Sequence, residues 1–301
     1  MRSRMLCAGL LLAAVGTIYG RDDATTGVPV RTVVTVEGKG SAPASTLNRE
    51  DVMVLQDKER RQVTEWAKAQ DLQLWLLIDD SVDQTLGNQF GDLRKFIEAL
   101  PADAQIGVGY IRNGTVEPGA PLTADHARAM KALRLPQGIA AGGASPYISL
   151  SELIRTWPAT QARREVLMIT SGIDFYYGPG PENPYLQRAI SDAQRAGVIV
   201  HSIYFGGFGH FGHDAWQINW GQNDLAQLSD ATGGEAYWQG FSNPVALQPY
   251  LDDFSHRLAN QYELTFLARA EKKGELEKFR VTTEVPRVSF AAPERVYVPA
   301  E

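Results

Sequence analysis

Short apolar runs alternate with segments of helical periodicity through the middle of the chain. Leu72–Ile78 is an almost unbroken apolar run, and Glu165–Thr170 is a second one. Strands that are buried on both faces have this pattern, as in a parallel sheet covered by helices. The apolar spacing of Asn88–Leu100 and of Ile148–Trp157 predicts amphipathic helices between and beside them. This alternation indicates βαβ units and therefore a doubly wound, mainly parallel α/β sheet.

The rest of the central region shows the same alternation of strands and helices. We predict further strands at Gln105–Ile111, Val198–Phe205 and Glu235–Trp238, with an antiparallel edge strand at Thr115–Leu122. Further helices are predicted at Ala124–Leu133, Pro184–Ala196, Asp224–Ala231 and Pro244–Ala259. Two long loops interrupt the pattern, the Gly/Ala-rich Pro136–Pro146 and the aromatic Gly206–Gly221.

Both flanks of this region have strand character without helices. Val28–Glu37, Val52–Leu55 and Gln62–Trp66 precede it, with a polar turn at Gln56–Arg61, and Tyr262–Ala268, Phe279–Glu284 and Arg295–Val298 follow it. We expect the two flanks to pair into one small β unit into which the α/β domain is inserted. The predicted division is a signal peptide at 1–20, a β segment at 21–69, the α/β domain at 70–261 and a second β segment at 262–301.

The first twenty residues differ from all that follow. Arg2 and Arg4 precede the apolar stretch Met5–Ile18, and small residues allow cleavage after Gly16 or Gly20. This is the pattern of an export signal, and about 14 apolar residues fall short of the ~20 that span a bilayer. We expect a periplasmic or secreted protein, with membrane association only if this segment stays uncleaved. Cys7, the only cysteine, would be lost with the signal, so no disulfide is expected.

The composition and net charge limit the classes of partner that the protein is expected to bind. The chain of 301 residues is 44% hydrophobic and 21% charged, as in ordinary globular proteins, and its net charge is −6 without a long Lys/Arg run. Phosphate contact needs a basic patch, so nucleic acid is not an expected partner.

The first buried strand ends in a cluster of oxygen ligands. Asp79, Asp80, Ser81 and Asp83 follow Ile78 directly, and open α/β sheets bind ligands beyond the carboxyl ends of their strands. Neighbouring carboxylates repel one another, so a cation would relieve the site. Mg2+ or Mn2+ is the candidate cofactor, held by Asp79, Ser81 and Asp83.

With these residues laid out, 70–261 resembles a von Willebrand factor type A domain. That family has a metal-ion-dependent adhesion site built from Asp-x-Ser-x-Ser after the first strand, a Thr in a later Gly-rich loop and an Asp before Gly after a later strand. Asp79 and Ser81 match the first motif. The flanks resemble a bacterial exported subgroup, through Leu47–Val52 and Tyr262–Leu264. The resemblance implies a non-enzymatic module for protein binding or cell adhesion.

The chain departs from the family's metal motif at three positions. Asp83 replaces the second Ser, Ala144 stands at the Thr position, and Ser171 stands at the later Asp position. Ser145 could substitute for the Thr by a shift of one residue, and Asp174 lies three residues beyond Ser171. Two readings follow from these changes: an altered cation site in which Asp83 restores the charge, or a decayed site that works without metal.

We expect a protein partner to bind a rim formed by the loops at the carboxyl ends of the strands. The predicted rim residues are Ser145, Tyr147, Ser171, Asp174, Tyr176, Phe208, Phe211 and Trp216. Aromatic side chains favour this role because they dominate interaction hot spots, although they can also form a loop's own small core. Two other functions stay open, a metal-dependent exported hydrolase and a purely structural module.

Three other motifs give weaker predictions. Gly207–Gly212 is a literal GxGxxG, but no helix is predicted before about Asp224 and its intervening residues are bulky, so we expect no dinucleotide and no other small-molecule cofactor. His210 and His213 alone are a weak zinc pattern. Gly143–Tyr147 lacks the last glycine of GxSxG. His201 lies in a strand and is expected in the core or at the sheet edge, and not as a catalytic base.

Overall fold

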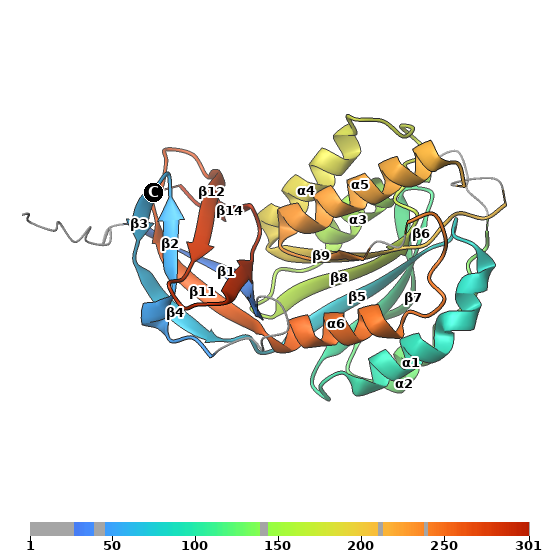
Figure 1. Cartoon of the computed structure of the whole chain (residues 1–301), viewed down its shortest axis with the longest axis horizontal. Coiled ribbons are helices and arrows are strands. Elements are labelled where there is room, and N and C mark those ends of the chain that lie inside the picture. Colours follow the sequence, from blue (N-terminus) through green and yellow to red (C-terminus); the bar gives the residue numbers. More distant parts are fainter. Residues whose placement is uncertain (1–26, 39–45, 139–143, 210–212, 238–239, 301) are drawn as a thin grey trace, which may run out of the picture.

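The computed structural model describes residues 27–38, 46–138, 144–209, 213–237 and 240–300. These residues form an α/β domain and a smaller β unit that packs at one end of it (Figure 1). The predicted signal peptide at 1–20 and Phe211 of the predicted rim lie outside the described residues. No helix of the described segments is both long and apolar enough to cross a bilayer.

The α/β domain is built on a six-stranded sheet. Its strand order is β10-β9-β8-β5-β6-β7, and all neighbours are parallel except the edge strand β7, which is antiparallel to β6. The strands are β5 (Leu72–Asp79), β6 (Gln105–Arg112), β7 (Thr115–Thr123), β8 (Arg163–Thr170), β9 (Val198–Tyr204) and β10 (Ala236–Tyr237). The almost unbroken apolar run of β5 is explained by its place between β8 and β6, where both faces are covered.

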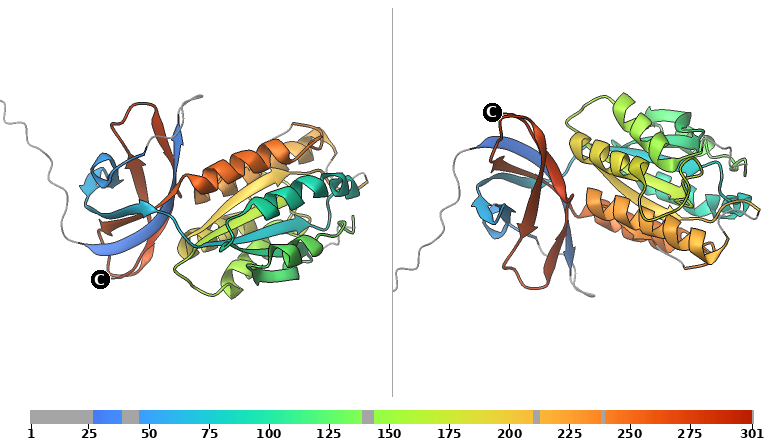
Figure 2. Two further views of the ribbon diagram at one scale, coloured as in Figure 1. Left: turned by 90° about the horizontal axis from the view of Figure 1, so that it is seen from below. Right: turned by 90° about the horizontal axis from the view of Figure 1, so that it is seen from above.

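Helices cover both faces of this sheet (Figure 2). One face packs against α1 (Phe90–Ala99), α2 (His126–Lys131) and α6 (Gln248–Ala259). The other packs against α3 (Pro146–Thr156), α4 (Pro184–Ala196) and α5 (Ala215–Thr232). A short 3-10 helix, η2 (Gln84–Gln89), follows β5.

The β unit is made from both ends of the chain. One sheet has the order β13-β1-β11-β4 and the other β14-β12-β2-β3. From the N-terminal side come β1 (Val28–Gly38), the 3-10 helix η1 (Arg49–Asp51), β2 (Met53–Gln56), β3 (Glu59–Arg61) and β4 (Val63–Lys68), and from the C-terminal side β11 (Gln261–Ala268), β12 (Glu275–Thr282), β13 (Val288–Ala291) and β14 (Arg295–Val298). Because β1 pairs with β11 along eight residues, the predicted fold class, an α/β domain with a β unit built from both flanks, is confirmed.

The structure differs from the predicted segments most clearly at one helix and two strands. Helix α5 begins at Ala215, nine residues before the predicted start at Asp224, because Asp214 caps it by accepting a hydrogen bond from the Gln217 N–H at 2.9 Å. The predicted polar turn at Gln56–Arg61 contains strand β3. Strand β13 was not predicted.

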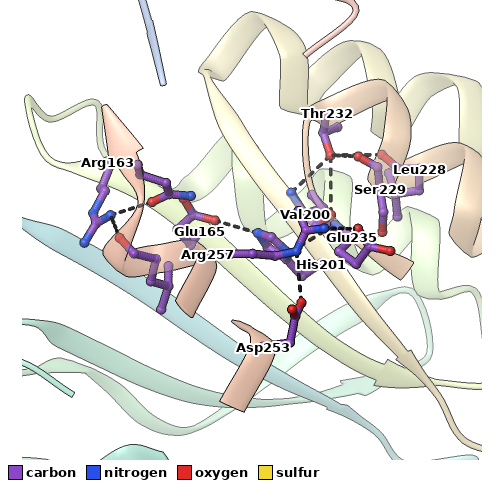
Figure 3. Close-up of polar contacts among 12 residues, drawn as sticks. Arg163, Glu165, Val200, His201, Leu228, Ser229, Thr232, Glu235, Asp253 and Arg257 are labelled. Atoms are coloured by element: carbon purple, nitrogen blue, oxygen red, sulfur yellow. Dashed lines mark hydrogen bonds and ion pairs between the residues drawn. The ribbon is translucent and has the colours of Figure 1, made fainter. Parts of the chain in front are cut away.

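A buried polar network joins the two units (Figure 3). Gln261 Nε2 donates to Glu165 Oε1 at 2.7 Å, and Glu165 Oε2 lies 3.1 Å from His201 Nε2. His201 Nδ1 accepts the Glu235 N–H at 3.1 Å. Nδ1 therefore carries no proton, so we assign the ring hydrogen to Nε2, which donates it to Glu165. As predicted, His201 is a buried structural residue; its environment fixes the orientation of β8, β9 and β11.

Candidate functional site

Asp79 ends β5 inside the protein. Its Oδ1 accepts the Ser81 N–H at 2.9 Å and its Oδ2 accepts the Thr170 hydroxyl at 2.7 Å. Thr170 ends the neighbouring strand β8, so the two strand ends meet as expected of parallel strands. Burial raises the pKa of Asp79, and the two hydrogen bonds oppose that rise. Asp79 thus ties two strand ends together from within.

Asp80 is neutralised by an arginine that the sequence did not single out. Arg134 Nη1 and Nη2 lie 2.7 and 2.9 Å from the two carboxylate oxygens of Asp80, a bidentate pair. The guanidinium also lies over the Tyr110 ring, 3.6 Å from its centroid. The Gly138 N–H donates to Asp80 O at 2.8 Å, which fixes the start of the following loop.

Asp83 serves as a helix cap. Its Oδ1 accepts the Thr85 N–H at 2.8 Å at the start of η2, and its own N–H donates to Gly206 O at 2.9 Å. The second contact joins the loop after β5 to the loop after β9. Asp83 therefore has a structural role that accounts for an acidic residue at this position.

The described donors do not fit a divalent-cation site. Within the described part of the chain, no group of three or more His, Cys, Asp or Glu side chains is placed to hold a metal ion. Ser81 Oγ is buried without a hydrogen-bond partner there and could accept a ligand, but Asp79 is engaged with Thr170 and Ser171 Oγ faces the Ile173 N–H at 3.4 Å. Mg2+ requires about six oxygen ligands at about 2.0–2.1 Å, more than this set supplies.

Metal addition should therefore leave stability unchanged. We expect the melting temperature of the protein to differ by less than about 1 °C between a chelator and millimolar Mg2+ or Mn2+, because only binding to the folded state raises it. Differential scanning fluorimetry measures this. A saturable rise that Asp79→Asn abolishes would establish a cation site here.

A second buried cluster lies between the starts of α3 and α4. The Ser145 hydroxyl donates to Asp174 Oδ2 at 2.8 Å, and Asn183 Nδ2 lies 3.3 Å from the same oxygen. Ser145 caps α3 and Asn183 caps α4. Asp174 Oδ1 accepts the N–H groups of Tyr176 and Tyr177 at 2.9 and 3.0 Å. Asp174 thus fixes two helix starts and the loop after β8.

Asp224 of α5 belongs to this cluster and titrates near neutrality. Burial raises its pKa to about 7, and the charge of Asp174 acts in the same direction, whereas Asn183 opposes it. The folded state therefore holds this proton more tightly than the unfolded chain, whose Asp groups titrate near 3.9. The free energy of unfolding consequently falls as pH rises from about 4 to about 7.

Asp224→Asn should remove this pH-dependent loss. At pH 8 we expect the variant to exceed the wild type by about 1–3 kcal/mol in the free energy of unfolding, since about 1.4 kcal/mol accompanies each pKa unit and partial solvation reduces the total. At pH 4, where the loss has hardly begun, the two should be nearly equal. Urea unfolding at both pH values measures the difference; an equal gain at both would assign it to packing instead of charge.

The prediction that a partner contacts the rim is wrong for four of the predicted residues. Ser145, Tyr147, Ser171 and Asp174 are buried, because each is used to hold the loops together. The Tyr147 hydroxyl, for example, donates to Gly172 O at 2.6 Å. Burial raises the Tyr147 pKa well above its usual value, so the ring remains a neutral structural anchor.

The other three described residues of the predicted rim are exposed aromatic residues. Tyr176 is 57% exposed, Phe208 45% and Trp216 56%. Sequence reasoning missed most of their neighbours. Among the described residues, the other large apolar side chains with high exposure are Leu135, Tyr177, Phe241, Val245 and, on the β unit, Tyr297. All of the exposed apolar residues except Tyr297 lie in loops or helix starts at the carboxyl edge of the sheet. We call these seven residues the apolar rim: Leu135, Tyr176, Tyr177, Phe208, Trp216, Phe241 and Val245.

Several contacts bring parts of this rim together. The Phe208 N–H donates to Ser81 O at 3.0 Å, and Val82 forms a bridge with Gly207. A Cβ on Gly138 would lie only 2.9 Å from the Phe208 ring, so the segment after Leu135 packs closely on Phe208. The loops after β5 and β9 and the segment after α2 thus form one connected surface.

No protein-family model matches the sequence, and no curated protein does. Among solved structures, an aerotolerance-related membrane protein from Bacteroides fragilis aligns with 62% of this chain and 98% of its own, at 14% identity and a TM-score of 0.45. A von Willebrand factor type A protein from Catenulispora acidiphila aligns with 93% and 75%, at 12% identity and a TM-score of 0.42. The SpRpn10 VWA domain aligns with 60% and 94%, at 14% and 0.40. Structures that resemble this chain therefore include von Willebrand factor type A domains.

Proposed function

We propose that the chain is an exported, non-enzymatic module that binds a protein partner through the apolar rim without a metal ion. The carrying observation is the distribution of exposed apolar side chains. Seven of the eight large ones in the described residues lie at one edge of one sheet. An exposed apolar cluster on a folded protein marks an interaction surface, and exposed aromatic side chains are the usual anchors of protein interfaces.

The placement of the carboxylates supports binding over hydrolysis. Asp79 pairs with Thr170 and Ser81, Asp80 pairs with Arg134, and Asp83 caps η2. A hydrolase of the kind considered would need two convergent carboxylates and a general base within reach of the same substrate atom. In the described residues no histidine hydrogen-bonds to any of these three carboxylates.

A rim variant tests the proposal. Replacing Phe208 and Trp216 together by serine should weaken partner capture by the immobilised mature chain at least about tenfold, because each buried aromatic anchor contributes about 1–2 kcal/mol or more. Both side chains are exposed, so folding should be unaffected. The readout is quantitative capture of one and the same protein, identified by mass spectrometry, by the wild type and by the variant.

Tyr297→Ser is the matched control, because Tyr297 is the exposed aromatic residue of the β unit. It should capture the partner as well as the wild type, with or without a chelator. Equal capture by the double variant would reject the apolar rim as the binding surface, and loss of capture in chelator would reject metal-independent binding.

A further inference from the structure

Two adjoining hollows lie where the β unit meets the α/β domain, at the end opposite the apolar rim. Their volumes are about 170 and 230 Å³, against about 30 Å³ for a water molecule in the liquid. They share Arg31, Thr32 and Val33 of β1 and Ala196 and Gly197 at the end of α4. They therefore form one groove, which we call the junction groove, with room for a small ligand.

All charged residues among the described lining of the junction groove are arginines. Arg31 and Arg195 line the first hollow, and Arg31, Arg163 and Arg164 line the second. No Asp or Glu is among the described lining residues of either hollow, although the whole chain carries a net charge of −6. Four arginines from β1, α4 and β8 thus converge on one groove in an acidic protein.

This positive charge is only partly compensated. Arg163 is 8% exposed, and its Nη1 donates to Gln261 Oε1 at 2.5 Å and to Leu258 O at 2.7 Å. Burial lowers its pKa and the charge of Glu165 opposes that change, while in the described structure its buried Nε has no hydrogen-bond partner. The charge of Arg163 also contributes, after burial, to lowering the pKa of Lys68 on β4, so a fifth cation is close. Burial lowers the pKa of Arg164. Like charges held together in this way favour an anion nearby.

Neighbouring groups reduce the positive charge of the junction groove without neutralising it. Arg31 forms an ion pair with Glu263 of β11 and donates to Gln161 Oε1 at 2.6 Å. Arg164 Nη2 donates to Ala196 O, so it covers a carbonyl at the end of α4 that would otherwise repel an anion. Arg195 is exposed, with its guanidinium 5.5 Å from the Tyr297 ring centroid.

We propose that the junction groove binds a phosphate group, either as the free ion or as part of a small phosphomonoester. Guanidinium forks match phosphate oxygens with paired hydrogen bonds, and a phosphate offers more oxygens than a carboxylate to arginines that approach from three elements. The bound anion links β1 of the β unit with α4 and β8 of the α/β domain. It therefore stabilises the arrangement of the two units.

Isothermal titration of the full mature chain at constant ionic strength tests the site. Inorganic phosphate is one probe and glycerol 3-phosphate is the other. We expect saturable binding of at least one probe, weakened about tenfold or more in Arg195→Gln and in Arg164→Gln, because a charge-assisted hydrogen bond contributes about 1.5–3 kcal/mol. If glycerol 3-phosphate binds more tightly than inorganic phosphate, the ligand is a phosphomonoester. If it binds equally or more weakly, the ligand is the free phosphate ion.

Arg188→Gln is the control. Arg188 also lies on α4, but it is exposed, pairs with Asp192 and does not line the groove. Its affinity should equal that of the wild type. The proposal is overturned if neither probe binds saturably up to about 10 mM, or if binding persists unchanged in Arg195→Gln, whose exposed side chain is not needed for folding.

Discussion

Replacing Glu165 by alanine is expected to lower the free energy of unfolding by about 3–5 kcal/mol. The carboxylate is fully buried and accepts hydrogen bonds from His201 and Gln261. Its removal leaves both donors buried without a partner and leaves a cavity, and loss of one member of a buried polar pair has costs of this size. Urea unfolding followed by circular dichroism measures the loss.

Glu152→Ala provides the comparison. Glu152 pairs with Arg155 on the exposed side of α3, and a surface pair contributes less than about 1 kcal/mol. Glu165→Gln should fall between the two, since its amide oxygen can still accept one hydrogen bond. If Glu165→Ala changed stability no more than Glu152→Ala, the network would not join the two units.

A second large effect is expected where two glycines interlock. Gly172 has φ +68°, and a Cβ on it would lie 2.3 Å from Gly221 O; a Cβ on Gly221 would lie 2.2 Å from Ser171 O. Gly172→Ala therefore adds backbone strain and a backbone clash, about 2–5 kcal/mol together. It should also weaken partner binding, because the clash would displace two parts of the apolar rim: Trp216 at the start of α5 and Tyr176 in the loop that follows Gly172. Thermal unfolding and the capture assay measure the two effects.

Gly91→Ala is the control for this substitution. Gly91 lies in α1, and nothing lies within 4 Å of a Cβ placed there. Alanine should stabilise the helix by about 0.5–1 kcal/mol. Comparable stability of Gly172→Ala and Gly91→Ala would show that α5 and the loop after β8 do not pack as closely as described.

Local signals explain which elements the sequence predicts well. The helix at Pro184–Ala196 was predicted to the residue, because proline opens it and Gly197, with φ +64°, ends it. Helix α5 also has capping residues, Asp214 at its start and Gly233 at its end, but the residues inside it favour a helix less. It contains Gly221 and several residues of low helix propensity, and Gly221 is there for the contact with Ser171 O, which no local pattern reveals.

The same limit applies to the site. The sequence placed Asp79 and Ser81 together, since both follow one strand. It could not show that Arg134 pairs with Asp80, because that contact joins residues 54 positions apart. Nor could it separate the buried polar residues of the loops, such as Ser145 and Asp174, from the exposed aromatic ones. Burial in a loop depends on tertiary contacts, whereas in a strand it follows from periodicity.

Site-specific photo-crosslinking in cells that make the protein tests whether the apolar rim binds a protein partner without a metal ion. A photoreactive amino acid is placed at the position of Phe208, Trp216 or Tyr297, one at a time. We expect an adduct with the same partner protein from positions 208 and 216, none from 297, and no change when a chelator is added. An adduct from position 297 alone, or adducts that disappear with chelator, would contradict it.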